Sequence, residues 1–249
     1  MIRFHFLLRP IDQVEPWDSG LHWFALTDGW YWIAVDDVQL LRYTPATARQ
    51  YGMDAHPYVD YYAVRLWEDV LQIIADVLNP VPAELLDFIA TDRSLWRHRI
   101  DDVDDDHPAV TAALWHGRHN LHLGYLRQPP HVRMWRTVLP GSDTVTVAWS
   151  HRIDSDIRYT APVIGSHEEA TATFLTAVRR LDAELMSEMD ARVSRLERTG
   201  PPAGVPLDVP ALRAEHTKRS TWLASRLRTP PEPADLAEVV EGVRHLGFL

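Results

Sequence analysis

Cysteine is absent from this chain of 249 residues. Its absence excludes disulfides, thiolate metal ligands and cysteine nucleophiles. The sequence also lacks any apolar run near the roughly 20 residues that a bilayer-spanning helix needs. The opening segment MIRFHFLLRP is too short and too alternating for a secretory leader, and Pro10 interrupts it. We therefore expect a cytoplasmic protein without a membrane contact.

Basic residues are scarce relative to acidic ones. The chain has 25 Lys and Arg against 35 Asp and Glu, a formal charge of -10, and Lys218 is its single lysine. A nucleic-acid binder gains affinity by neutralising phosphates, so this balance argues against nucleic acid as a partner. An acidic surface can instead attract a basic protein.

Sequence motifs of catalysis are also missing. The nucleophile elbow G-x-S-x-G, the P-loop, the dinucleotide motif G-x-G-x-x-G and the zinc motif H-E-x-x-H do not occur. The sequence therefore identifies no catalytic residue and no cofactor, and it leaves open whether the protein is an enzyme.

Tryptophan is abundant, with ten in the chain, and three of them lie in the stretch LHWFALTDGWYWIAVDD. Asp28-Gly29 between two aromatic runs predicts a two-residue β-hairpin, because a type I′ turn needs positive φ at both central positions. Strand alternation then places Trp23, Trp30 and Trp32 on the same face of the ribbon.

Further strands and helices follow from local patterns. Residues 3–9 predict a strand, and Asp36-Asp37 turns the chain into VQLLRY. Residues 59–78 carry a broad apolar stripe at helical spacing, and PAELLDFIA predicts a second helix at 82–91. The runs HNLHLGYL, VRMWRTV and TVTVAWSHR predict a second group of strands, with Pro129-Pro130 and Pro140-Gly141-Ser142-Asp143 as turns.

The C-terminal third reads as helical. Ser166 and Glu169 have capping-box spacing and predict a helix that continues to Arg198. Two further helices follow, ALRAEHTKRSTWLASRL with Asp208 as its cap, and ADLAEVVEGVRHL after PPEP.

This order of elements favours an α+β fold, an antiparallel, tryptophan-rich sheet with helices packed on one face and a C-terminal helical segment. We expect residues 1–165 to be mainly β, with the two helices 59–78 and 82–91 inserted. Residues 166–249 would add helices to the same core, within one domain.

Two interpretations of the tryptophan face remain open. Indoles interleaved with small residues leave flat surface for sugars, nucleobases, cations or an aromatic partner residue. The favoured interpretation places helix 59–78 across them, because buried aromatic residues mostly serve packing. Asp60 at the start of that helix is either a helix cap or a base beside aromatic residues. The candidate ligand- or partner-binding residues are Trp23, Trp30, Trp32, Asp60, Tyr61, Arg65 and Trp67.

Histidines and aspartates offer weaker candidates for a metal. On a strand, His116 and His122 would lie on one face and His119 on the other, so the three could not easily share one ion. The run Asp101–Asp106 contains D-D-x-x-D, a pattern that can hold Mg²⁺ and a diphosphate from a helix. Here it lies in a predicted loop, and a solvated acidic loop is favoured. We predict no metal site, with His116 and His122 as the alternative.

Several aromatic strings resemble a family of actinobacterial proteins of unknown function. They are LHWFALTDGWYWI with LLRY, then PYVDYYAVRLWEDVL, then GYLRQPPHVRMWR, and the resemblance covers most of the chain. These motifs are not catalytic signatures, so the resemblance carries over no active-site residue. It implies a high-GC bacterial host, in keeping with the predominance of arginine over lysine, and a cytoplasmic setting.

The favoured hypothesis for function is a non-catalytic protein-binding module. An acidic, tryptophan-rich domain of this size is similar in character to bacterial immunity proteins, which capture a basic toxin through charge and aromatic anchors. The alternative is a small-molecule-binding protein or enzyme of secondary metabolism. Its apolar or aromatic ligand would lie between the tryptophan face and the helices. A third hypothesis is a homo-oligomer paired through helix 167–198, and the sequence leaves the oligomeric state undetermined.

Overall fold

Four strands near the N-terminus form the first of two antiparallel sheets. The computed structural model describes residues 1–16, 20–53, 55–101, 103–201 and 205–249. β1 (Ile2–Leu8) pairs with β2 (Gly29–Val35), which pairs on its other side with β3 (Val38–Leu40) and β4 (Val59–Asp60). The short helix α1 (Pro45–Gln50) lies between β3 and β4 in the chain.

The segment before β2 differs from the expected hairpin. Ala25–Thr27 is a short 3₁₀ helix, and β2 pairs with β1 instead of with the residues that precede it. Trp23 and Leu26 have no exposed surface. A Cβ atom at Gly29 would overlap the carbonyl oxygen of Leu7, so glycine is needed here for the close approach of β1. The predicted type I′ turn is therefore wrong.

The two faces of β2 have different surroundings. Tyr31 and Ile33 are buried, whereas Trp30 and Trp32 are partly exposed. Trp30 and Trp32 thus share the outward face of the first sheet, and Trp23 does not belong to it. The expectation of three indoles on one face is wrong because the chain at Trp23 is not a strand.

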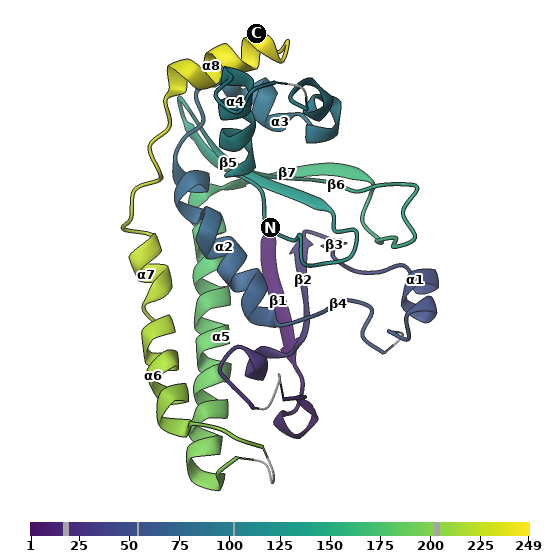
Figure 1. Ribbon diagram of the computed structural model, residues 1–249, viewed down its shortest axis with the longest axis vertical. Helices are drawn as coiled ribbons and strands as arrows, with labels where there is room; N and C mark the ends of the chain where they lie inside the picture. The colour runs from purple at the N-terminus through teal and green to yellow at the C-terminus, as the bar shows by residue number, and fades with distance from the viewer. Residues whose placement is uncertain (17–19, 54, 102, 202–204) are drawn as a thin grey trace.

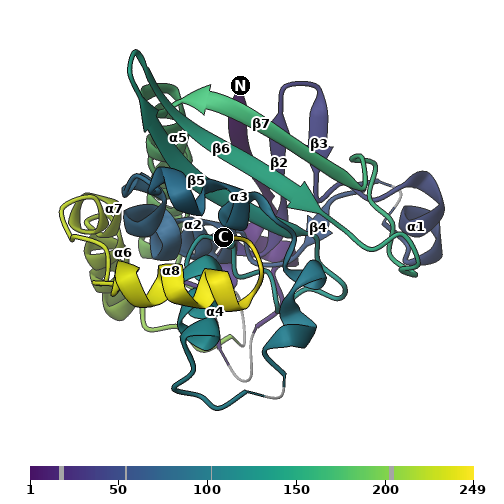
Figure 2. The ribbon, with the colours of Figure 1, turned by 90° about the horizontal axis from the view of Figure 1, so that it is seen from above.

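Three strands form the second sheet, in the order β5 (His131–Leu139), β6 (Ser142–Ser150) and β7 (Ile164–Ala170). The β5–β6 hairpin turns at Pro140-Gly141, as expected from the sequence, and Gly141 has a φ of 80°. Figure 2 shows this sheet lying across the end of the first one.

β7 occupies the place of a predicted helix start. Ser166 and Glu169 lie in this strand, opposite Ala148 and Val145 of β6, so they do not form a capping box. The helix α5 (Thr171–Thr199) begins only after the strand and ends one residue beyond the predicted end. The Glu169 carboxylate accepts the backbone N–H of Ile2 at 2.7 Å, which ties the second sheet to the first.

One group of helices packs against the first sheet. It comprises α2 (Ala63–Leu78), the long α5, α6 (Val209–Arg219) and α7 (Trp222–Arg226), with α6 packed on α5 and α7 on α2 (Figure 1). α2 begins four residues later than expected, because Val59 belongs to β4. Asp208 caps α6, as predicted, by accepting the N–H of Ala211.

A second group of helices covers the other end of the molecule. It comprises α3 (Leu86–Ala90), α4 (Pro108–Gly117) and α8 (Leu236–His245), and it encloses a separate apolar cluster that includes Phe88 and Trp96. α3 and the 3₁₀ turn before it match the helix expected at 82–91. α4 was not expected, and residues 119–126, predicted as a strand, lie in the loop that follows it.

The α+β class with antiparallel sheets is confirmed. The strands form two sheets where one was expected, and the helices form two groups in place of a layer on one face. Within the described ranges, no helix has both the length and the apolar character required to cross a bilayer.

Candidate functional site

A cleft of about 960 Å³ lies where the two helix groups meet. α2, α4, the loop 118–131 and the connection 226–232 surround it, and that connection runs from α7 to α8 (Figure 1). Ile73, Leu121 and Leu123 contribute to its apolar wall. Ile73 is available here because the apolar stripe of α2 extends beyond the width of the first sheet.

Positive charge exceeds negative charge in this cleft, opposite to the balance of the whole chain. The ionised lining residues among those described are Arg93, Arg118, Arg133, Arg226, Asp76 and Glu232. Arg118 is engaged with Glu232, to whose carbonyl it donates at 2.9 Å and from whose carboxylate its Nη2 lies 3.6 Å away. In the described part of the chain, neither Arg93 nor Arg226 has an ion-pair partner.

Arg133 is the buried member of this set, with 7% of its surface exposed. Its Nη1 and Nη2 donate to the carbonyls of Thr91 and Ala90 at 2.6 and 3.1 Å. These carbonyls end α3, where the helix itself supplies no donors. Among the described residues, no carboxylate pairs with the guanidinium and its Nε has no hydrogen-bond partner. Burial lowers the pKa of Arg133, and only nearby Asp92 opposes this effect.

His116 lies directly behind Arg133. Its Nε2 is 3.2 Å from Arg133 Nη1 and it has no exposed surface. Burial, and then the positive charge of Arg133, lower the pKa of His116 to about 3. The ring is therefore neutral at neutral pH, and its Nε2 can accept a hydrogen bond from Arg133.

The metal alternative finds no support. His116 lies in the last turn of α4 and His122 lies exposed in the following loop, so the strand face that they were expected to share does not form. No group of three or more metal-ligating side chains occurs within the described ranges. Asp102 of the acidic run falls outside those ranges.

Trp23 is part of the core wall, as the favoured interpretation expected. Its indole N–H donates to His216 Nδ1 at 3.4 Å, and the Arg219 guanidinium lies 4.5 Å from the ring centroid. The ring thereby fixes α6 against the segment that precedes β2.

Trp30 and Trp32 stack on side chains of their own sheet and its margins. The Trp32 ring lies 4.0 Å from that of Tyr58 and 4.9 Å from that of His5. Trp30 lies 4.0 Å from the His56 ring, and the Arg9 guanidinium lies 4.1 Å from its centroid. These intramolecular stacks occupy ring surface that a ligand platform would have to offer.

Asp60 is not the cap of α2. Tyr62 directly precedes the helix, and the N–H of Val64 donates to Thr27 Oγ1 at 3.4 Å. Asp60 instead pairs with Arg9, which also pairs with Asp28.

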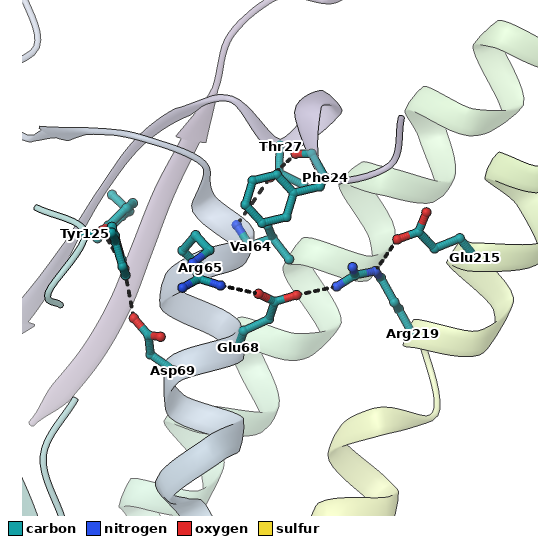
Figure 3. A network of polar contacts seen from close by, with 10 residues as sticks. Phe24, Thr27, Val64, Arg65, Glu68, Asp69, Tyr125, Glu215 and Arg219 are labelled. Atoms are coloured by element: carbon teal, nitrogen blue, oxygen red, sulfur yellow. Dashed lines mark hydrogen bonds and ion pairs between the residues drawn. The ribbon is translucent and has the colours of Figure 1, made fainter. Parts of the chain in front are cut away.

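Tyr61, Arg65 and Trp67 lie on or next to α2, and Arg65 joins a network of polar contacts there through Glu68 (Figure 3). Tyr61 stacks on Tyr125 at 4.9 Å, and the Arg65 guanidinium lies 5.0 Å from the same ring. Trp67 is buried and donates its N–H to Asp182 at 2.9 Å. These residues hold helices and loops together, and none of the three lines the cleft.

The sequence patterns did not point to the cleft. Arg93, Arg133 and Arg226 lie far apart in the chain, and each is unremarkable among many arginines. The pocket expected between the tryptophan face and the helices is therefore not the site that the structure offers. The available signal was indirect: Arg133 is the charged residue within the run Val132–Trp135, all four residues of which are buried.

A protein-family model with the description "Family of unknown function" (DUF5984) matches residues 3–242. No curated protein and no solved structure matches the chain. The matched segment contains both sheets, the helices of both groups except the end of α8, and the cleft. The chain therefore belongs to the DUF5984 family, a family of unknown function, as the resemblance of its aromatic motifs implied.

Proposed function

We propose that the protein binds a small organic molecule in the cleft between α2 and α4. The observation that carries this proposal is the cleft itself, which at about 960 Å³ is within the size range of small-molecule sites. It combines apolar walls with a few polar side chains, the composition typical of such sites. Small-molecule binding is also the alternative function that the sequence suggests, with the ligand placed against the tryptophan face.

Protein binding is the second candidate. Leu7 is 46% exposed on the outward face of the first sheet, next to Trp30. This apolar and aromatic surface supports a partner, as the immunity-like hypothesis requires. The flanking exposed cations Arg3 and Arg42 favour an acidic partner segment over the basic one expected from the net charge. Leu7→Arg should then abolish partner capture and leave the cleft unaffected.

The neutral dye N-phenyl-1-naphthylamine, which fluoresces in apolar surroundings, tests the first candidate. Gly117 lines the cleft, and among the described atoms none lies within 4 Å of a Cβ built there. Gly117→Phe therefore fills the cleft without a clash at its Cβ atom. We expect dye affinity to fall about tenfold, which corresponds to about 1.4 kcal/mol.

Ala191→Phe is the matched control, because Ala191 is an exposed residue of α5 outside the cleft. It should bind the dye as the unaltered protein does. Absence of dye binding, or an equal loss in both variants, would contradict a ligand site in the cleft.

A further inference from the structure

One end of the cleft brings together two arginines and a histidine from separate segments. Arg93 follows α3, and His131 and Arg133 come from the start of β5, and all three line the cleft. Burial lowers the pKa of His131, and the charges of Arg133 and Arg93 lower it further. These groups therefore act on one another and create a shared positive field.

The nearest acid is already engaged within the fold. Asp92 accepts hydrogen bonds from the hydroxyl of Ser150 and from the backbone N–H of Ser94, the latter at 2.8 Å. These bonds lower the pKa of Asp92 to about 2 against the opposing effect of burial, so it stays ionised. It offsets part of the positive charge but does not form an ion pair with Arg133.

A structural role explains Arg133 only in part. Its two terminal nitrogens donate hydrogen bonds to the last carbonyls of α3, and this role explains why an arginine, with two such nitrogens, stands here. It does not account for the burial of a full charge without a carboxylate, which is unfavourable unless an anion compensates it. Nor does it explain why Arg93, which shares the cleft, also has no acidic partner among the described residues.

We infer that the ligand of this cleft is an organic anion whose carboxylate or phosphate group binds at the end formed by Arg93 and Arg133. This inference rests on the proposed small-molecule function and specifies its ligand class. Arg93 is exposed and can contact the anion directly. Arg133 is buried beneath the cleft surface, and its positive charge attracts the anion from there. The apolar body of the ligand lies against Ile73, Leu121 and Leu123.

Two dyes that differ only in a charged group test this inference. The first is 8-anilinonaphthalene-1-sulfonate, and the second is the neutral N-phenyl-1-naphthylamine, which lacks the sulfonate. We expect the anionic dye to bind about tenfold more tightly. A hydrogen bond to a charged group contributes about 1.5–3 kcal/mol, and a tenfold change in affinity corresponds to about 1.4 kcal/mol. Its affinity should also fall as salt rises, whereas that of the neutral dye should not.

Arg93→Gln identifies the end of the cleft that binds the anion. It should remove most of the advantage of the anionic dye and leave the affinity of the neutral dye unchanged. Arg228→Gln is the control, because Arg228 is exposed in the same part of the chain as Arg226 but does not line the cleft. Competition by 1-naphthoate and by 1-naphthyl phosphate then distinguishes a carboxylate ligand from a phosphate ester.

The outcomes separate this inference from the proposed function. Equal affinity for the two dyes, or an equal effect of Arg93→Gln and Arg228→Gln, would overturn the anion site while the small-molecule function stands. If neither dye binds, both are overturned. The inference is supported if one of the two naphthyl anions displaces the anionic dye from the unaltered protein and this displacement is lost in the Arg93→Gln variant.

Discussion

Tyr125 donates its hydroxyl proton to Asp69 Oδ2 over 2.8 Å, and this aspartate is only 2% exposed. The Tyr125 hydroxyl also lies 2.9 Å from that of Tyr31, so the three side chains form a buried chain of polar groups. Burial raises the pKa of Asp69 to about 7, which outweighs the opposing effects of Tyr125 and Arg65. The fold therefore contains a carboxyl group that titrates near neutral pH.

Asp69→Asn should make stability less dependent on pH. The folded-state pKa is raised above the ordinary value of an aspartate, about 3.9, so ionisation of Asp69 opposes folding. The unaltered protein should lose stability as pH rises from about 4 to about 7, by up to about 3 kcal/mol between about pH 5 and pH 8. Urea unfolding at both pH values measures this loss, which the variant should lack.

Asp37→Asn is the control for this experiment, because Asp37 is exposed in the turn between β2 and β3. Its unfolding free energy should follow the pH dependence of the unaltered protein. The same pH dependence in Asp69→Asn would show that Asp69 is not the group that titrates.

Gly29 offers a test of the strand pairing. A side chain at this position would overlap the backbone of Leu7 and force β1 away from β2. Gly29→Ala should therefore reduce the free energy of unfolding by about 3 kcal/mol. Gly29→Asn should be at least as harmful, although asparagine is well tolerated in the type I′ turn that the sequence suggested.

Gly117→Ala is the control for this prediction. Position 117 is helical and, within the described ranges, open to a Cβ atom, so alanine should be neutral or stabilise the protein by up to about 1 kcal/mol. Thermal unfolding of the three variants measures the effects. A protein that tolerates asparagine at position 29 would not have the β1–β2 pairing described here.

Local patterns predicted the elements whose cause is local. The apolar stripe of α2, the Pro140-Gly141 turn and the cap of α6 by Asp208 all depend on residues within a few positions of one another. Asp28-Gly29 is a position where a local pattern predicts the wrong structure. The same dipeptide suits a tight turn, but its glycine is required by a strand more than twenty residues earlier.

The missed elements and the cleft depend on distant partners. IGSHEEA has few apolar residues, yet it is a strand because it pairs with β6 along its whole length. Asp69 falls opposite the apolar stripe in the helical spacing of α2, yet it is buried and the distant residue Tyr125 bonds to it. Arg93 and Arg133 likewise line the same cleft because Arg133 of β5 reaches the carbonyls at the end of α3, a contact that no short pattern encodes.

Arg219 should be important for attaching α6 to α2. Its guanidinium pairs with Glu68 at 2.6 Å and with Glu215 at 2.8 Å, and it lies between the rings of Trp23 and Trp222, 4.5 and 4.7 Å from their centroids. Arg219→Met keeps the apolar stem but removes the charge, and we expect a loss of about 2 kcal/mol in urea unfolding.

A matched variant lies on the same helix. Arg213 pairs with Asp190 and Glu197 near the surface, its side chain 31% exposed, so Arg213→Met should cost less than about 1 kcal/mol. A double-mutant cycle between Arg219→Met and Glu68→Gln should give a coupling of about 1 kcal/mol. No coupling between them would mean that the ion pair does not hold α6 in place.

Gly242 controls the attachment of α8, and through it one wall of the cleft. A Cβ atom there would overlap the carbonyl of Pro108 at the start of α4, so Gly242→Ala should push α8 away at a cost of about 2 kcal/mol. The connection 226–232 would lose its C-terminal anchor, and tryptic cleavage after exposed Arg228 should become faster. Dye binding in the cleft should weaken in parallel, whereas Ala191→Phe, at an exposed position of α5 outside the cleft, should alter neither. Unchanged proteolysis of Gly242→Ala would show that α8 does not anchor this wall.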